Sequence, residues 1–226
     1  MRIFRNTLAV TIITVILLAL FGIAFGASPS SASAAVADEK VSYMPVPAGT
    51  YNLDVNHGVI GFGVEHLEIA IVEGRFKDFS GTIVYDDKDV TRSTVQFMAK
   101  IASIDTGVAP RDAHLRTADF FNAEKYPELT FKSTKVEKKG KGYLLSGDLM
   151  IKGVTRPISF PFSIKGAVKD PWGGTRFGIE AETEISRRDF GITYGNALPG
   201  GGFDVANEVE IDLHLEAVKA EPKAAE

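Results

Sequence analysis

The four histidines of the chain, His57, His66, His114 and His214, are the first candidates for catalysis or metal binding. No two of them have the spacing of an H-E-x-x-H helix or of another recognised metal motif. The chain contains no cysteine, which excludes a thiol nucleophile and every cysteine-based metal site. It also lacks a G-x-S-x-G elbow and a Walker-type glycine loop, so we expect no catalytic residue, metal or cofactor.

One of these histidines, His66, shares its parity in the sequence with Ile60, Phe62 and Val64. In a strand these four side chains point to the same face, and that face is apolar. An inward histidine is either a core residue whose hydrogen bonds are satisfied or a polar group that meets the head of a ligand. A metal ligand is the third interpretation.

Charged residues crowd one short stretch of the chain, where Arg111, Asp112, His114, Arg116 and Asp119 lie close together. Two interpretations are open. Arg111, His114 and Arg116 could contact the polar head of a ligand at the mouth of a binding site. Alternatively, opposite charges in a helical turn could form local salt bridges that order the loop.

The elements that must position these residues are strands, because residues 51–218 alternate apolar and polar side chains with period two. Near the end of this region, Ile211 and Leu213 alternate with Asp212 and His214. Such a pattern is typical of antiparallel strands with one face in contact with water. The expected strands lie near 59–66, 71–85, 93–102, 128–138, 142–152, 155–168, 174–186 and 206–218.

About eight strands of this length favour an all-β, eight-stranded antiparallel barrel over a sandwich. Two stretches break the alternation. Residues 105–127 form a long loop in which Pro110 suits the first position of a short helix. Residues 186–203 are rich in glycine and predict a second long loop, and long loops in a compact domain are often functional.

An eight-stranded barrel is either filled by its own side chains or encloses one small ligand. Small residues at inward positions, Ala99, Gly147 and Ala181, favour a cavity. Strands of about ten residues, tilted near 40°, make a tunnel roughly 26 Å long, which suits a chain-like apolar molecule. The inward residues expected to contact it are Ile60, Phe62, Val64, His66, Phe97, Ala99, Ile101, Phe131, Leu149, Phe160, Phe162, Phe177, Ile179, Ile211 and Leu213.

The first 34 residues predict export. Arg2 and Arg5 precede an apolar run from Thr7 to Ala27, which is long for a signal peptide and close to the roughly 20 residues that span a bilayer. We therefore divide the chain into a signal peptide or N-terminal membrane anchor (1–34), a spacer (35–48), a β-barrel (49–218) and a flexible tail (219–226). Both readings of the N-terminus place the barrel outside the cytoplasm, in the periplasm or at the cell surface.

The formal net charge argues against two classes of partner. It is −4 for the whole chain, and removing the two arginines of residues 1–34 takes it to −6. A net negative surface disfavours nucleic acids and anionic lipid headgroups, but it does not repel an uncharged lipid tail. We expect membrane contact only through an uncleaved N-terminal segment.

Several motifs, in order and covering about Tyr51 to Glu216, resemble those of the YceI-like polyisoprenoid-binding family. The early ones are Tyr51-Asn52-Leu53-Asp54, Phe62-Gly63-Val64-Glu65-His66-Leu67, Gly74-Arg75-Phe76-Lys77-Asp78-Phe79-Ser80-Gly81, Arg111-Asp112-Ala113-His114-Leu115-Arg116, Asp119-Phe120-Phe121, and Tyr126-Pro127 with Thr130-Phe131. The later ones are Gly147-Asp148-Leu149-Met150-Ile151-Lys152-Gly153-Val154-Thr155-Arg156 and Ser186-Arg187-Arg188-Asp189-Phe190-Gly191-Ile192.

The resemblance implies a lipocalin-like, extended eight-stranded barrel that binds an isoprenoid lipid, such as a quinone or a prenyl-phenol, for transport, storage or sequestration. It also implies a binding protein without an established reaction, and homodimers occur in the family. Two alternatives stay open. One is an enzyme acting on a lipid or small amphiphile through His66 with Arg111 or Asp112. The other is a structural or adhesion module whose barrel is filled.

Overall fold

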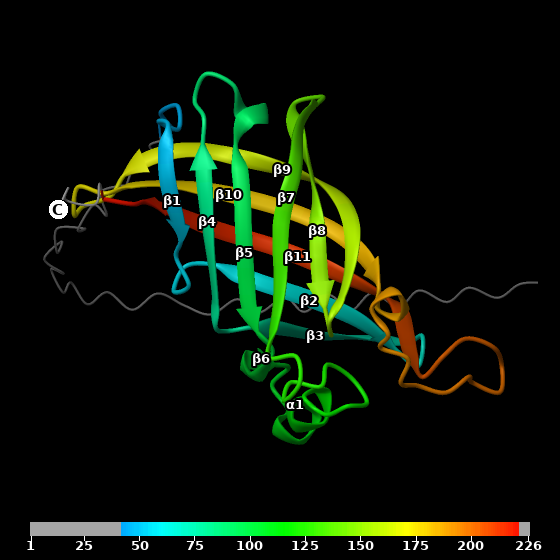
Figure 1. The fold of residues 1–226 in the computed structure, drawn as a ribbon. Helices are drawn as coiled ribbons and strands as arrows, with labels where there is room; N and C mark the ends of the chain where they lie inside the picture. Colours follow the sequence, from blue (N-terminus) through cyan, green and yellow to red (C-terminus); the bar gives the residue numbers. More distant parts are fainter. Residues whose placement is uncertain (1–41, 222–226) are drawn as a thin grey trace, which may run out of the picture. The chain divides into compact units, whose positions relative to one another are not determined.

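The computed structural model describes residues 42–221, so the predicted signal peptide or anchor lies outside the described residues. The described part consists mainly of antiparallel strands (Figure 1). The strands are β1 (Gly49–Leu53), β2 (Val59–His66), β3 (Ala70–Phe76), β4 (Phe79–Tyr85), β5 (Thr94–Lys100), β6 (Ile104–Asp105), β7 (Glu128–Lys139), β8 (Gly142–Ile151), β9 (Val154–Lys169), β10 (Thr175–Ser186) and β11 (Val205–Lys219). The helical segments are α1 (Ala109–Leu115) and the 3-10 turns η1 (Val90–Arg92), η2 (Ile101–Ser103) and η3 (Arg187–Phe190).

Eight of these strands close into a ring in the order β1-β4-β5-β7-β8-β9-β10-β11, because β1 also pairs with β11. Every pairing in the ring is antiparallel. Figure 1 shows β4, β5 and β7 crossing in front of β10 and β11. The predicted all-β, eight-stranded antiparallel barrel with a short helix in a long loop is confirmed.

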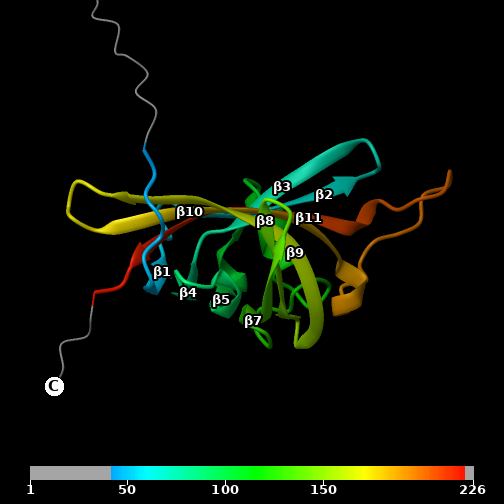
Figure 2. The ribbon, with the colours of Figure 1, turned by 90° about the horizontal axis from the view of Figure 1, so that it is seen from above.

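Strand β11 pairs with two different strands along one edge. Because one of these partners is β2, a second hairpin is attached to the ring. Its first part, from Val205 to His214, pairs with β2, and its last residues, Ala217 to Lys219, pair with β1. β2 then pairs with β3 (Figure 2, cyan), and β3 pairs with β6. β2 and β3 therefore extend the barrel wall at the end where β11 begins.

Two details of the predicted strands are wrong. The stretch 71–85 is two strands, β3 and β4, separated at Lys77 and Asp78. Phe76 and Phe79 are both buried although they have opposite parity, so the chain must turn between them. Strand β1 was not predicted, because five residues with a single fully buried side chain, Tyr51, are too short to show alternation.

The chain just before β1 is not a plain spacer. Met44 exchanges backbone hydrogen bonds with Ala167 of β9, at 2.9 and 2.8 Å. Val46 is buried, and the Tyr51 hydroxyl donates to the carbonyl of Pro47 at 2.6 Å. Since β9 and β1 are not neighbours in the ring, residues 44–48 pass across the end of the barrel and cover it. The predicted spacer is wrong for this part.

The C-terminal boundary also shifts. β11 continues to Lys219, and the amide of Ala220 donates to the carbonyl of Thr50 at 2.8 Å. The first residues of the predicted flexible tail therefore belong to the sheet. Among residues 42–221 there is no helix of the length and apolarity needed to cross a bilayer.

The ladder between β9 and β10 covers only part of these strands. It ends where Phe162 pairs with Ala181, and the first half of β9 pairs with β8 alone. Pro157 and Pro161 lie in that half, and a proline has no N–H to give to a second neighbouring strand. The residues of β10 beyond Ala181 therefore have no backbone partner on β9 at one end of the barrel.

Candidate ligand-binding site

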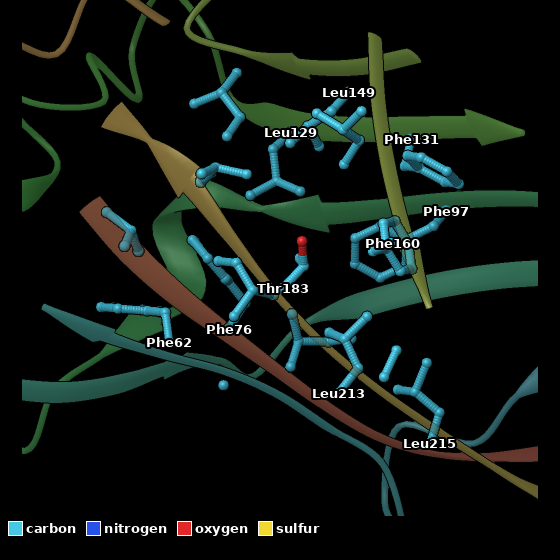
Figure 3. Close-up of a pocket in the computed structure, with 18 of the residues that line it drawn as sticks. Phe62, Phe76, Phe97, Leu129, Phe131, Leu149, Phe160, Thr183, Leu213 and Leu215 are labelled. Carbon is cyan, nitrogen blue, oxygen red and sulfur yellow. The ribbon is translucent and has the colours of Figure 1, made fainter. Parts of the chain in front are cut away.

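The barrel encloses a cavity of about 430 Å³, within the range of roughly 300–1,000 Å³ that is usual for small-molecule sites. Figure 3 shows side chains from many strands pointing into it, among them Phe97, Phe131, Phe160, Leu149 and Leu213. Most lining residues are apolar because successive strands present their inward, alternate positions. The inward faces of the strands do not fill the space between them, so the barrel holds an apolar cavity.

Most of the predicted contact residues line this cavity, and three do not. Ala99, Ile101 and Arg116 are absent from its wall. Ala99 is fully buried within the wall itself. Ile101 lies in the turn η2 beyond the end of β5, where the strand parity no longer applies. The other predicted residues, from Ile60 on β2 to Leu213 on β11, and Arg111 and His114, line it.

Two glycines in the wall leave less room than their size indicates. A Cβ atom built on Gly147 would lie 2.4 Å from the Phe131 ring and 2.5 Å from the Lys132 carbonyl. A Cβ atom on Gly74 would lie 2.3 Å from the ring of Phe62, its partner across the β2–β3 ladder. The expectation that Gly147 opens cavity space is wrong, since an aromatic ring occupies that space.

The cavity opens where β2 ends and β11 begins. Its exposed lining residues, Glu65, His66 and Tyr194, lie at this end. His66 is paired with Val205, and the amide of Leu67 donates to Asp204 at 3.0 Å. His66 lines the cavity but is exposed, so its interpretation as a satisfied core residue is wrong. It is a polar group at the mouth.

The segment around α1 borders the same mouth, and its charged residues make local contacts. The Nε and Nη2 atoms of Arg111 donate to the hydroxyl and the carbonyl of Thr106, at 2.7 and 2.8 Å. The buried Asp112 carboxylate accepts from the Thr106 amide at 2.9 Å. His114 and Asp119 are 2.9 Å apart. Local ordering is thus present, and His114–Asp119 is the one contact between a basic and an acidic side chain among these five residues.

An aromatic cluster fixes α1 against the second long loop. The rings of His114, Phe120 and Tyr194 contact one another with centroid distances of 5.1, 4.9 and 4.7 Å. Arg116 lies behind α1, where it donates to the carbonyl of Ile104 at 2.9 Å. Its Nε is buried without a hydrogen-bond partner among the described residues, and no part of it reaches the cavity. Arg116 is therefore placed to hold the loop rather than to meet a ligand.

Arg187 is a buried cation in the cavity wall. Its guanidinium donates to the carbonyls of Ala206, Val205 and Ile192, at 2.7, 2.8 and 3.1 Å. Burial away from water lowers the pKa of Arg187 from its ordinary value, and the nearby charge of Arg188 adds to this effect. These three bonds tie the start of β11 to the segment after η3, so Arg187 shapes the mouth.

Outside the cavity, Arg176 joins three carboxylates near the opposite end of the barrel. It donates to Asp54 and Asp170 at 2.7 Å each and also to Glu216. The pKa of Asp54 is lowered to about 2, mainly by its hydrogen bond with His57 and further by Arg176. Asp54, His57 and Glu216 could together face a metal ion, but the guanidinium of Arg176 already bonds to both carboxylates of this group. We assign it a structural role.

Several cavity residues escaped prediction. Thr183 has the same parity as Phe177, Ile179 and Ala181 on β10, so alternation could have placed it inward despite its hydroxyl group. Tyr194 and Phe120 come from irregular loops, where no periodicity identifies the inward side chains. Their positions depend on tertiary contacts alone.

Residues 51–217 match the YceI-like domain. The protein YceI of Escherichia coli is 39% identical over 175 residues, which are 76% of this chain and 86% of that relative. The crystal structure of the Campylobacter jejuni YceI protein is 31% identical, with a TM-score of 0.59 over 70% of this chain and 90% of its own.

A polyisoprenoid-binding domain from Saccharophagus degradans has the same fold, with a TM-score of 0.58 at 16% identity over 77% of this chain and all of that domain. The barrel, its enclosed cavity and the sequence match agree with one another, and this chain belongs to the YceI-like family.

Proposed function

We propose that this protein binds a long isoprenoid lipid, with a quinone or prenyl-type head, inside its barrel and carries or stores it outside the cytoplasm. The observation that carries the proposal is the apolar cavity, which is open at the end formed by His66 and Tyr194. Near its other end, the buried Val46 belongs to one apolar cluster with the lining residue Phe177. The polyisoprenoid-binding domain of Saccharophagus degradans, which has this fold, supports the choice of ligand.

Energetics support a carrier. Burying about forty chain carbons at about 0.8 kcal/mol each would nominally exceed the practical ceiling of about 20 kcal/mol for binding. Such a lipid is never free in water, because its alternative location is a membrane. The relevant quantity is the small free energy of exchange between bilayer and barrel, and a small value permits release.

The location rests on sequence alone. Arg2, Arg5 and the apolar run from Thr7 to Ala27 support export, either with cleavage or with retention as an anchor. An anchored barrel would stay within reach of the membrane that holds its cargo.

An enzyme built on His66 with Arg111 or Asp112 has less support. Among residues 42–221, no hydrogen bond joins His66 to either residue. Asp112 and Arg111 are both engaged with Thr106. A catalytic base needs a hydrogen-bonded partner or a substrate within reach. In the described part of the chain, His66 has no such hydrogen bond to Arg111 or Asp112.

The test is native mass spectrometry of the full chain purified from its own host, with a lipid extract analysed beside it. We expect a stable additional mass that matches a prenyl lipid. Val209 lines the cavity without joining a buried core cluster, so Val209→Trp should fill cavity space and reduce co-purified lipid at least fivefold.

The matched control is Val84→Trp, which places the same bulk at an exposed position of β4 and should leave the lipid content unchanged. A chain that is free of lipid and stays so when long-chain quinones are offered would overturn the proposal.

A further inference from the structure

Thr183 places a hydroxyl group inside the mainly apolar cavity. It follows Ala181 and precedes Ile185 in the inward series of β10, and it lies opposite Ile211 of β11. Figure 3 shows its oxygen pointing into the space between Leu129 and Phe160. The ladder with β9 has already ended at Ala181, so no strand on that side covers this position through backbone pairing.

Among the polar lining groups of the described residues, the side chains of Thr183, Glu65, His66 and Tyr194 form no hydrogen bond, and Thr183 is the one of these four that does not lie exposed at the mouth. Arg111 is bonded to Thr106, and Arg187 is bonded to three carbonyls. His66 is exposed at the mouth, where water can reach it. A hydroxyl in an apolar space without a partner is unfavourable relative to the isosteric methyl group of valine. A polar ligand atom at this point would remove that cost.

We propose that the Thr183 hydroxyl forms a hydrogen bond with an uncharged oxygen of the bound lipid, a carbonyl or a hydroxyl. This inference rests on the proposed function and adds the position and class of the lipid's head, which lies inside the barrel below the mouth. A charged head such as a phosphate is disfavoured there, because one neutral hydroxyl cannot offset the loss of its hydration.

The length of the wall on either side of Thr183 sets the direction of the tail. Six residues along β10 separate Thr183 from Phe177, a rise of about 20 Å through Ala181 and Ile179. Toward the mouth only Ile185 intervenes before the buried cation Arg187. The longer apolar wall lies on the Phe177 side, so the tail extends away from the mouth.

The test compares two probes of equal carbon number, a polyprenol and the corresponding oxygen-free polyprene, each binding to the full chain in the same detergent. One net hydrogen bond of ordinary strength predicts that the wild type prefers the polyprenol by about fivefold. Thr183→Val should abolish this preference by weakening polyprenol binding and leaving or strengthening polyprene binding. Thr183→Ser, which keeps the hydroxyl, should retain it.

The matched control is Thr155→Val, the same change at an exposed position of β9 outside the cavity. It should keep the wild-type preference, and thermal unfolding should show that each variant is folded. A preference that survives in Thr183→Val would overturn the inference while leaving the proposed function standing. Failure of the wild type to bind either probe would overturn both.

Discussion

At the scale of single residues, the cavity is shaped by aromatic rings that lie over glycines. Phe131 covers Gly147 and Phe62 covers Gly74, so each ring takes the volume that a side chain would need. This arrangement explains why the glycines do not widen the cavity. Replacing Gly147 or Gly74 by any larger residue must therefore move the Phe131 or the Phe62 ring, and both rings line the cavity.

Gly147→Ala should therefore destabilise the barrel by about 1–3 kcal/mol, the usual cost of overpacking. The added methyl group would meet both the Phe131 ring and the Lys132 carbonyl, and the carbonyl belongs to a ladder strand that cannot easily shift. Urea denaturation measures the effect. Gly200→Ala is the control, since its Cβ atom would meet nothing within 4 Å, and an equal loss in both variants would contradict the argument.

At the scale of elements, Arg176 connects three parts of the chain. Its partners Asp54, Asp170 and Glu216 belong to the β1–β2 connection, the β9–β10 turn and β11. The side chain of Arg176 is 19% exposed, so these bonds are partly shielded from water. Arg176→Gln should cost about 2–3 kcal/mol, because hydrogen bonds to charged groups are among the stronger ones.

The same cluster predicts how stability depends on pH. The pKa of Asp54 is lowered to about 2 and that of Asp170 is also lowered, so their contribution is fully present above the ordinary carboxyl pKa. It is lost as the pH falls toward 2. Arg176→Gln should flatten the acid limb of the stability curve measured by urea denaturation between pH 5 and pH 2.

The control for this prediction is Lys165→Gln, which removes the exposed pair with Glu180. Exposed pairs contribute about 0–1 kcal/mol, so this variant should keep both the stability and the acid limb of the wild type. An unchanged acid limb in Arg176→Gln would show that other carboxylates dominate.

The strands could be predicted where apolar and polar residues alternate over a long stretch. The prediction failed where this alternation is interrupted. β10 and β11 repeat their pattern over more than ten residues each, and their inward faces follow directly. β1 is too short to repeat anything, and Ile101 has strand parity but lies in a turn. The mouth was predicted only in part: Arg111 and His114 line it as expected, but Tyr194 reaches it through contacts with His114 and Phe120 that no pattern reveals. Periodicity describes a strand, whereas a loop position is set by its tertiary partners.

At the scale of the whole molecule, an unfilled cavity at the centre of a barrel couples ligand binding to stability. The inward side chains of the ring leave a cavity between them, so a bound lipid supplies contacts that these side chains do not. A ligand that binds the folded state alone stabilises it by about 2.7 kcal/mol at one hundred times its dissociation constant. For a domain of this size, that corresponds to a rise in Tm of roughly 5–10 °C.

Removal of bound lipid by organic extraction should lower the Tm by this amount, and reloading with a long-chain prenol should restore it. Differential scanning calorimetry measures both steps on the same preparation. Val209→Trp provides the contrast, because its indole ring occupies cavity space and its Tm should respond little to either treatment. If the extracted wild type keeps its Tm, the barrel is stable without cargo, and its cavity serves exchange without contributing to folding.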